Sequence, residues 1–296
     1  MAQKIVSLRK KINIAGDLQS VVRTMKAMAA SNIGQYESSL KALGDYNRTV
    51  ELGLGACFRQ QKNIVTEINS KSRFDNGINN VVIFGTDQGL VGQFNDVISQ
   101  YTFKAIQNLP GDTRFWSVGE RVHSRLLDGG LKVEKIFPLP KSIKAITPLV
   151  GKILVETVAN NEVDAEIHVA KTSLHLIYNQ RKTETLYEPV HKIILPLDNH
   201  WQRQLAHQPW PKARYAEVIG PSRSTLGVFI REYLFVSLFA ACTESLASEN
   251  TSRLVAMERA DKNIEELLTK LSGVFNQLRQ TSIDEELFDI ISGYDN

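Results

Sequence analysis

The chain has 296 residues, of which 43% are hydrophobic and 23% are charged, so it can form two ordinary domains or one domain with a long helical extension. Its net charge of +3 does not indicate that the chain as a whole binds nucleic acid. The two cysteines, Cys57 and Cys242, cannot form a disulfide framework and lack metal-ligand spacing, so we interpret them as buried apolar residues.

The N-terminal segment predicts a long helix over residues 1–60. Counting in alternating steps of three and four gives a seam that is mostly apolar and runs from Ile5 through Leu8, Ile12, Ala15, Val22, Ala29, Ile33, Tyr36, Leu40, Leu43, Val50 and Leu54 to Cys57. This pattern begins near residue 3 without a preceding apolar run, so we expect neither a secretory signal nor an organelle transit peptide. The strongest apolar stretch, residues 228–242, is interrupted by Arg231 and Glu232, and no direct membrane insertion is expected.

The middle of the chain, residues 76–198, is predicted to form an α/β domain of Rossmann-like type. Apolar strands are predicted at 80–85, 114–118, 131–137, 165–170, 174–179 and 184–195, with helices at 95–108, 120–127 and 147–160. Alternation of continuous apolar strands with helices predicts a partly parallel sheet that ends in antiparallel strands.

The C-terminal segment predicts a second long helix over residues 222–293, entered through a proline-containing linker at 199–221 that we expect to be extended. Its seam includes Leu226, Phe229, Tyr233, Val236, Leu254, Met257, Ile264, Leu268, Leu271, Phe275 and Leu278. The fold class is therefore α/β, with a long antiparallel two-helix coiled coil formed by the two terminal segments around the inserted domain.

Charge supports this antiparallel pairing. Residues 1–30 carry six basic side chains and one acidic side chain, whereas residues 253–289 carry eight acidic and five basic side chains. Opposite charges that flank a seam help to set the partner and the orientation. Two solvated helix faces of unrelated charge remain the alternative.

The C-terminal helix is longer than its partner by about fifteen residues, or some 20 Å of helix. Its unpaired tip carries Ile283, Leu287, Phe288, Ile290 and Ile291, which would be exposed to water without a partner. Another chain should therefore surround the tip, unless the tip folds back onto its own domain.

No catalytic, cofactor or metal site is predicted. The glycine-rich loop from Gly85 to Gly92 follows a strand, but it has neither GxGxxG nor P-loop spacing, so a tight structural turn is favoured over a nucleotide site. The six histidines show no ligand spacing. The acidic group Asp284, Glu285, Glu286 and Asp289 is typical of a helix first turn and outer face rather than of a general acid and base.

Several of these residues resemble one known family, the gamma subunits, or central rotor shafts, of F-type ATP synthases. The resemblance is carried by Ala247, Ser248, Glu249, Arg253, Met257, Asn276, Arg279, Gln280, Ile283, Glu286, Leu287, Ile290 and Gly293 near the C-terminus, by Met25, Ala29, Ala30 and Ser31, and by Asp87, Gly89, Leu90, Gly92 and Asn95. The sequence departs from the family pattern at Lys26, Asn32, Gln88, Asp284 and Tyr294, which indicates a somewhat divergent bacterial or archaeal member.

The resemblance implies a rotor that is not itself an enzyme, with no cofactor and no nucleic acid. The implied partners are three alpha and three beta subunits of a catalytic ring, an epsilon subunit and the c-ring of the membrane sector. The implied location is the cytoplasmic face of the cell membrane, as a peripheral part of the complex. The residues expected to contact the ring are Arg9, Lys10, Lys11, Arg23, Met25, Lys26, Arg253, Met257, Arg279, Gln280, Ile283, Glu286, Leu287 and Ile290. An alternative is a nucleotide-binding α/β enzyme with a coiled-coil dimerisation arm; another is a coiled-coil tether or chaperone.

Overall fold

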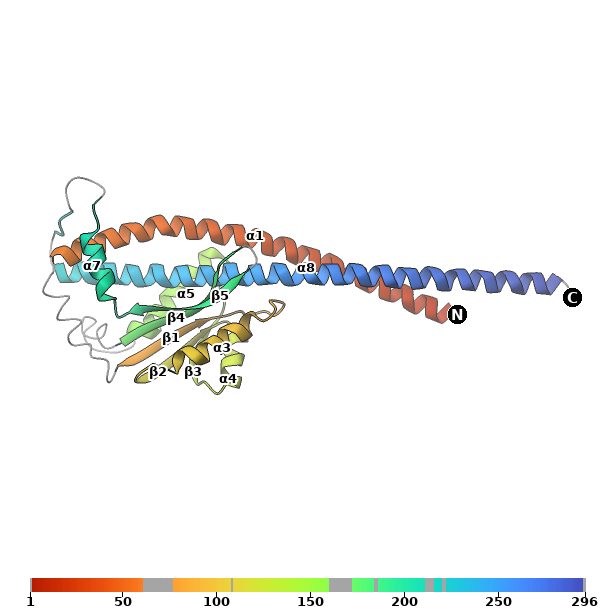
Figure 1. Cartoon of the computed structure of the whole chain (residues 1–296), viewed down its shortest axis with the longest axis horizontal. Helices are drawn as coiled ribbons and strands as arrows, with labels where there is room; N and C mark the ends of the chain where they lie inside the picture. Colours follow the sequence, from red (N-terminus) through yellow and green to blue (C-terminus); the bar gives the residue numbers. More distant parts are fainter. Residues whose placement is uncertain are drawn as a thin grey trace. The chain divides into compact units, whose positions relative to one another are not determined.

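The structure, a computed structural model, describes residues 2–60, 77–107, 109–159, 172–183, 186–210, 216–219 and 222–294. It divides into two compact units. The hairpin unit consists of Met1–Ser31 and Arg253–Asn296, and the α/β unit consists of Asn32–Ser252. Helix α1 (Ala2–Gln60) and helix α8 (Ser222–Tyr294) each contribute to both units (Figure 1).

The α/β unit is built on a five-stranded sheet with strand order β3-β2-β1-β4-β5. Strands β1 (Ile78–Phe84), β2 (Asp112–Val118), β3 (Val133–Phe137) and β4 (Thr172–Arg181) are parallel, and β5 (Tyr187–Leu195) pairs antiparallel with β4. The predicted mixed sheet is thus confirmed. The strand predicted at 165–170 lies outside the described residues.

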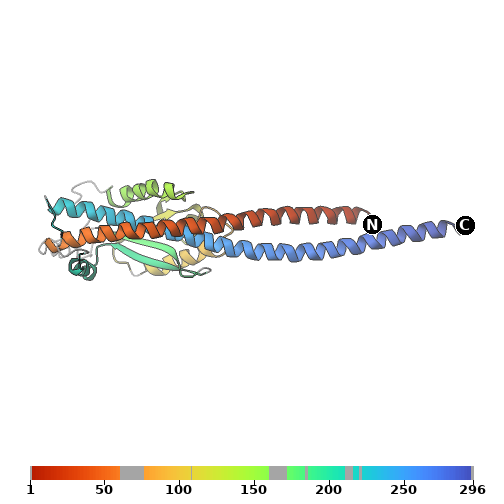
Figure 2. The ribbon, with the colours of Figure 1, turned by 90° about the horizontal axis from the view of Figure 1, so that it is seen from above.

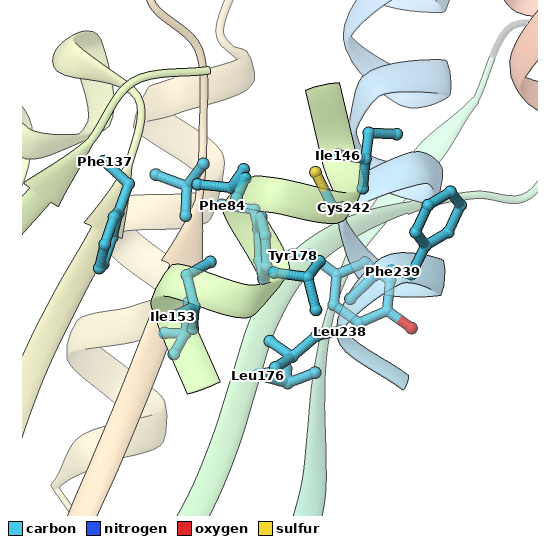
Figure 3. Packing of buried hydrophobic residues seen from close by; sticks show 14 of the residues in the cluster. Phe84, Phe137, Ile146, Ile153, Leu176, Tyr178, Leu238, Phe239 and Cys242 are labelled. Carbon is cyan, nitrogen blue, oxygen red and sulfur yellow. The ribbon is translucent and has the colours of Figure 1, made fainter. Parts of the chain in front are cut away.

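Successive side chains along each strand point to opposite faces of the sheet, and helices cover both faces. Val81 and Ile83 of β1 pack with Ile98 of α3 (Phe94–Ile106) and with Val122 of α4 (Glu120–Asp128). On the opposite face, Phe84, Leu176 and Tyr178 form one buried cluster with residues of α5 (Ile143–Leu154) and of α8, as Figure 3 shows. Because both faces are covered there, the central strand β1 carries a continuous buried apolar run at residues 81–84, whereas the edge strands β3 and β5 are more polar and partly exposed.

The long terminal helices pair through the seams expected from the sequence. In the hairpin unit, Ala15 and Val22 of α1 pack with Met257 and Ile264 of α8, and each pair is spaced by one heptad. In the α/β unit, Val50, Leu54 and Cys57 share a cluster with Leu226 and Val236. The predicted coiled-coil pairing of the two terminal segments is therefore confirmed within each unit.

Two local predictions were wrong. The segment 199–221 was expected to be extended, but it contains helix α7 (Asn199–His207). The Asp198 carboxylate accepts the backbone N–H groups of His200 and Trp201, which caps the helix, and Leu205 is buried beside Leu54. Helix α5 begins four residues before the predicted start, with Pro148 inside it, and continues as the π-helical turn η1 (Val155–Ala159).

Among the described residues, α8 is the one helix long and apolar enough to cross a membrane when judged by length and composition only. Its most apolar window has a mean hydropathy of 1.5, and 44% of that window is buried. Leu234, Leu238 and Cys242 of this helix belong to the core of the α/β unit. Burial of this kind accounts for the apolar composition without a bilayer.

Candidate partner-contact surface of the helical hairpin

Polar contacts fix the register of the two helices in the hairpin unit. Gln19 Nε2 donates to Asp261 Oδ1 at 3.0 Å, and Lys26 Nζ lies 3.3 Å from Glu258 Oε1. A step forward along α1 thus corresponds to a step backward along α8, so the helices run antiparallel. The same register places the start of α1 near Gln280. The last residues of α8 extend beyond the start of α1, as Figure 2 shows.

The end of α8 past this point has a large apolar surface. Ile283, Leu287 and Phe288 are 47%, 52% and 72% exposed, respectively. Asp284, Glu285 and Glu286 between them are also exposed. An exposed group of large apolar side chains is typical of a surface that a partner covers.

The predicted contact residues at the end of the hairpin where α1 begins lie on its surface. Arg9, Lys10 and Lys11 on α1 and Arg279 and Gln280 on α8 are all exposed. The side chain of Ile290 is not among those that the structure describes. Arg253 and Met25 are half-buried.

Three other predicted contact residues are engaged within the hairpin itself. Arg23 Nε donates to Asp261 Oδ1 at 3.1 Å, and Lys26 pairs with Glu258. The hydrogen bond from Gln19, followed by the hydrogen bond and charge of Arg23, lowers the pKa of Asp261. Met257 is only 3% exposed and packs in the hairpin core, so its side chain has little surface left for another chain.

A second apolar stripe on α1 was not recognised from the sequence. Ile14, Leu18, Val21 and Met28 are each between 52% and 60% exposed, and with Met25 they follow a spacing of four and three residues. The stripe could have been found by counting along the same helix in steps of three and four from a residue outside the seam, such as Ile14. This stripe adds to the surface that a partner of the hairpin could cover.

The glycine-rich loop after β1 uses its polar groups within the fold. Thr86 N donates to Asn95 Oδ1 at 3.1 Å, and Asn95 Nδ2 donates to Thr86 Oγ1 at 2.8 Å. The Asp87 carboxylate accepts the backbone N–H groups of Glu120 and Leu139, both at 3.0 Å. Glu120 begins α4, so a carboxylate already occupies the helix N-terminus where a phosphate would bind.

The same loop also makes a hydrogen bond to α8. Ser252 Oγ donates to Val91 O at 2.6 Å, and Gly92 beside it has a φ of +56°. Gly119, at the neighbouring strand end, has a φ of +109°, and a Cβ there would lie 2.8 Å from the backbone of Thr86. The predicted structural turn is therefore confirmed, and its motif residues Asp87, Gly92 and Asn95 have structural roles.

Within the described ranges, no group of three or more His, Cys, Asp or Glu side chains is arranged to hold a metal ion. The fold and its exposed surfaces instead define a class of protein in which antiparallel N- and C-terminal helices are joined to a mixed α/β unit. Comparison with known proteins identifies the family within that class.

Residues 4–296 match the sequence model of the family described as ATP synthase. Similar curated proteins include the ATP synthase gamma chain of Caldicellulosiruptor saccharolyticus, 26% identical over 99% of this chain and 98% of that protein. The ATP synthase gamma chain of a Sulfurihydrogenibium species is 25% identical over 96% and 95% of the two chains. This chain belongs to the ATP synthase gamma chain family.

Solved structures share the fold. A chain of the Euglena gracilis mitochondrial ATP synthase (OSCP/F1/c-ring, rotational state 3) has a TM-score of 0.64 at 16% identity, covering 99% of this chain and 94% of that chain. A chain of the Tetrahymena thermophila mitochondrial ATP synthase central stalk and c-ring has a TM-score of 0.57 at 20% identity, covering 81% of this chain and 99% of that chain.

Proposed function

We propose that this chain is the central stalk subunit of an F-type ATP synthase, which rotates inside the catalytic ring and couples ion flow to ATP synthesis or hydrolysis. Its partners would be three alpha and three beta subunits, an epsilon subunit and the c-ring. Membership of the gamma chain family supports this proposal, together with the chain of the Tetrahymena thermophila central stalk and c-ring that shares its fold.

In this role the chain itself carries no catalytic site. It would act as a peripheral subunit at the cytoplasmic face of the cell membrane. The glycine-rich loop, whose donors and acceptors are used within the fold, supports the non-catalytic assignment over a nucleotide-binding enzyme. Titration of the purified chain with ATP and NAD tests this point, because the competing enzyme hypothesis requires binding to the chain alone.

The observation that carries the proposal is the apolar end of α8, which extends beyond the start of α1 with Leu287 and Phe288 exposed. A ring of subunits around this end would remove its apolar surface from water. Because two paired helices are not three-fold symmetric, each angle of the stalk would favour a different conformation at each catalytic site. Rotation would then change the relative populations of the conformations at each catalytic site, which couples rotation to the reaction.

The test compares two double substitutions in α8 of the assembled complex. Leu287→Ser with Phe288→Ser should weaken retention of the chain in the complex and lower coupled ATP synthesis at least about tenfold, since two large apolar side chains lose their burial. Asp284→Ser with Glu285→Ser, on the same turns, should leave both readouts close to wild type. Equal behaviour of the two variants would remove the assignment of the helix end to the ring.

Composition of the purified complex gives an independent test. Native mass spectrometry should find one copy of this chain with several copies of a larger ATPase subunit. A stable homodimer of the chain without such subunits would instead support a coiled-coil tether.

A further inference from the structure

The α/β unit contains a groove of about 470 Å³ that no function described above uses. Its walls come from α1, β5, α7 and α8, and its lining includes Gly44, Glu51, Lys192, Trp201, Tyr233 and Glu244. The volume lies within the range of natural ligand pockets. Gly44 leaves the α1 wall open, since a Cβ at this position would meet no atom within 4 Å.

One end of the groove is aromatic. The rings of Trp201 on α7 and Tyr233 on α8 lie 4.8 Å apart at an angle of 37°. The faces of such rings carry partial negative charge and attract cations, with tryptophan the strongest. An aromatic pair beside a polar wall is a suitable surface for the flat guanidinium of an arginine.

The charge of the groove is predominantly acidic. Glu51 and Glu244 line it, and so does Asp198, whose carboxylate already accepts two N–H groups of α7. Lys192 contributes a positive charge to the same lining. Oε2 of Glu244 is buried and accepts no hydrogen bond from any described residue.

The environment of Glu244 shows that its carboxylate lacks a full set of partners. Burial raises the pKa of Glu244, and this effect is only partly opposed by hydrogen bonds from Tyr178 and Gln180 and by the charge of Lys192. A buried carboxylate oxygen without a donor costs free energy that an added cationic donor would recover.

We propose that this groove is a docking site for a segment of another protein subunit that inserts an arginine or lysine side chain between the Trp201–Tyr233 pair and the carboxylates of Glu51 and Glu244. The proposal rests on the proposed function only in placing the chain inside a multisubunit complex. Charge complementarity selects a basic side chain. The apolar remainder of the lining, which includes Leu43 and Val236, favours an amphipathic segment.

The position of the groove favours a polypeptide over a free cation. Lys192 and Ile193 belong to β5, which is the edge strand of the sheet, and both are exposed. An edge strand presents unpaired backbone N–H and C=O groups along one side, and these groups can bond another chain.

The test uses a photo-reactive phenylalanine analogue at Gly44 in the purified complex, with the same residue at Gly34 as the matched control. Gly34 also lies on α1, and a Cβ there would likewise meet no atom within 4 Å, but it does not line the groove. Irradiation should give an intersubunit adduct at position 44, and its linked peptide should contain an arginine or lysine next to the linked residue. Position 34 should give no such adduct.

Neutralising the acidic wall by Glu51→Gln and Glu244→Gln should lower the adduct yield about tenfold, because a charge-assisted contact is lost. An unchanged yield, a linked peptide without a basic residue, or no adduct in an intact complex would each overturn the proposal. A further outcome would also overturn docking: position 44 forms no adduct, and spermidine raises the thermal stability of the wild type but not that of the double variant. The groove would then be assigned to a small cation.

Composition of the same preparation before irradiation separates the two proposals. If the chain purifies without ATPase subunits, the proposed rotor function fails. If it purifies with them and position 44 forms no adduct, only the docking site fails.

Discussion

His175 and His191 lie against each other on β4 and β5. Nδ1 of His175 is 2.8 Å from Nε2 of His191, and the rings are stacked with centroids 5.0 Å apart. Nε2 of His175 also contacts Ser173 Oγ at 2.9 Å, and Ser173 donates to Asn79. Burial, followed by the charge of His191, lowers the pKa of His175 from 6.5 to about 4, and burial also lowers that of His191.

This pair should make the α/β unit less stable in mild acid. A histidine with a depressed folded-state pKa stabilises the fold fully above its unfolded pKa of about 6.5, and this contribution is lost as the pH falls toward the folded value. Between about pH 7 and about pH 5.5, the free energy of unfolding should fall by about 1 kcal/mol from His175. Urea unfolding of the full chain measures this change, and His175→Gln should show a shallower pH dependence. An identical pH dependence in wild type and variant would contradict the assignment.

Asp87 should be a stability residue rather than a ligand-binding residue. Its carboxylate accepts two backbone N–H groups, one of them at the start of α4. Asp87→Ala should lower the free energy of unfolding by about 1–2 kcal/mol, as expected for the loss of a helix cap. Asp45→Ala, at an exposed position of α1, should change it by less than about 0.5 kcal/mol. Chemical denaturation of both variants provides the comparison.

At the scale of the elements, pairing of α1 with α8 in the hairpin unit depends on a small buried seam. Met257 is 3% exposed in this seam, whereas Met28 is 60% exposed on α1 of the same unit. Met257→Ala should cost about 2 kcal/mol or more because it leaves a cavity, and Met28→Ala should be nearly neutral. Hydrogen exchange of the hairpin amides measures both effects. Faster exchange in the Met28 variant than in the Met257 variant would contradict the seam.

For the whole molecule, the exposed basic group at the start of α1 (Arg9, Lys10 and Lys11) stays a predicted contact with the catalytic ring, and we expect acidic groups of the ring to attract it. Lys10→Glu with Lys11→Glu should lower coupled turnover of the complex about two- to tenfold at low salt, with a smaller loss at high salt, because exposed charge attraction is screened. Lys41→Glu with Arg48→Glu, an exposed pair on the α/β part of α1, should have little effect. Arg23 and Lys26 are less suitable for this test, because their reversal would also break the contacts with Asp261 and Glu258.

Much of the fold was accessible from the sequence because its signals are local and repeated. The three-four spacing of Ala15 and Val22 and of Met257 and Ile264 predicted the seams that the structure contains. The apolar runs of β1 and β4 predicted a partly parallel sheet, in which these two strands pair. Helix α7 was missed because Pro209, Pro211 and Pro221, which all follow it, led to the whole segment being interpreted as extended. Its cap, Asp198, and its buried residue, Leu205, give only a short signal.

By itself, the sequence determined the two long helices, the α/β order between them and the excess length of α8, since periodicity and chain length carry that information directly. Only the tertiary structure decided which residues are free to meet a partner. In the tertiary structure Met257 is buried, Arg23 and Lys26 form ion pairs within the hairpin, and Asp87 accepts hydrogen bonds from the backbone of the α/β unit. The tertiary structure also brings Glu51 and Glu244 to one groove. These outcomes depend on contacts between residues far apart in the chain, which no local pattern specifies.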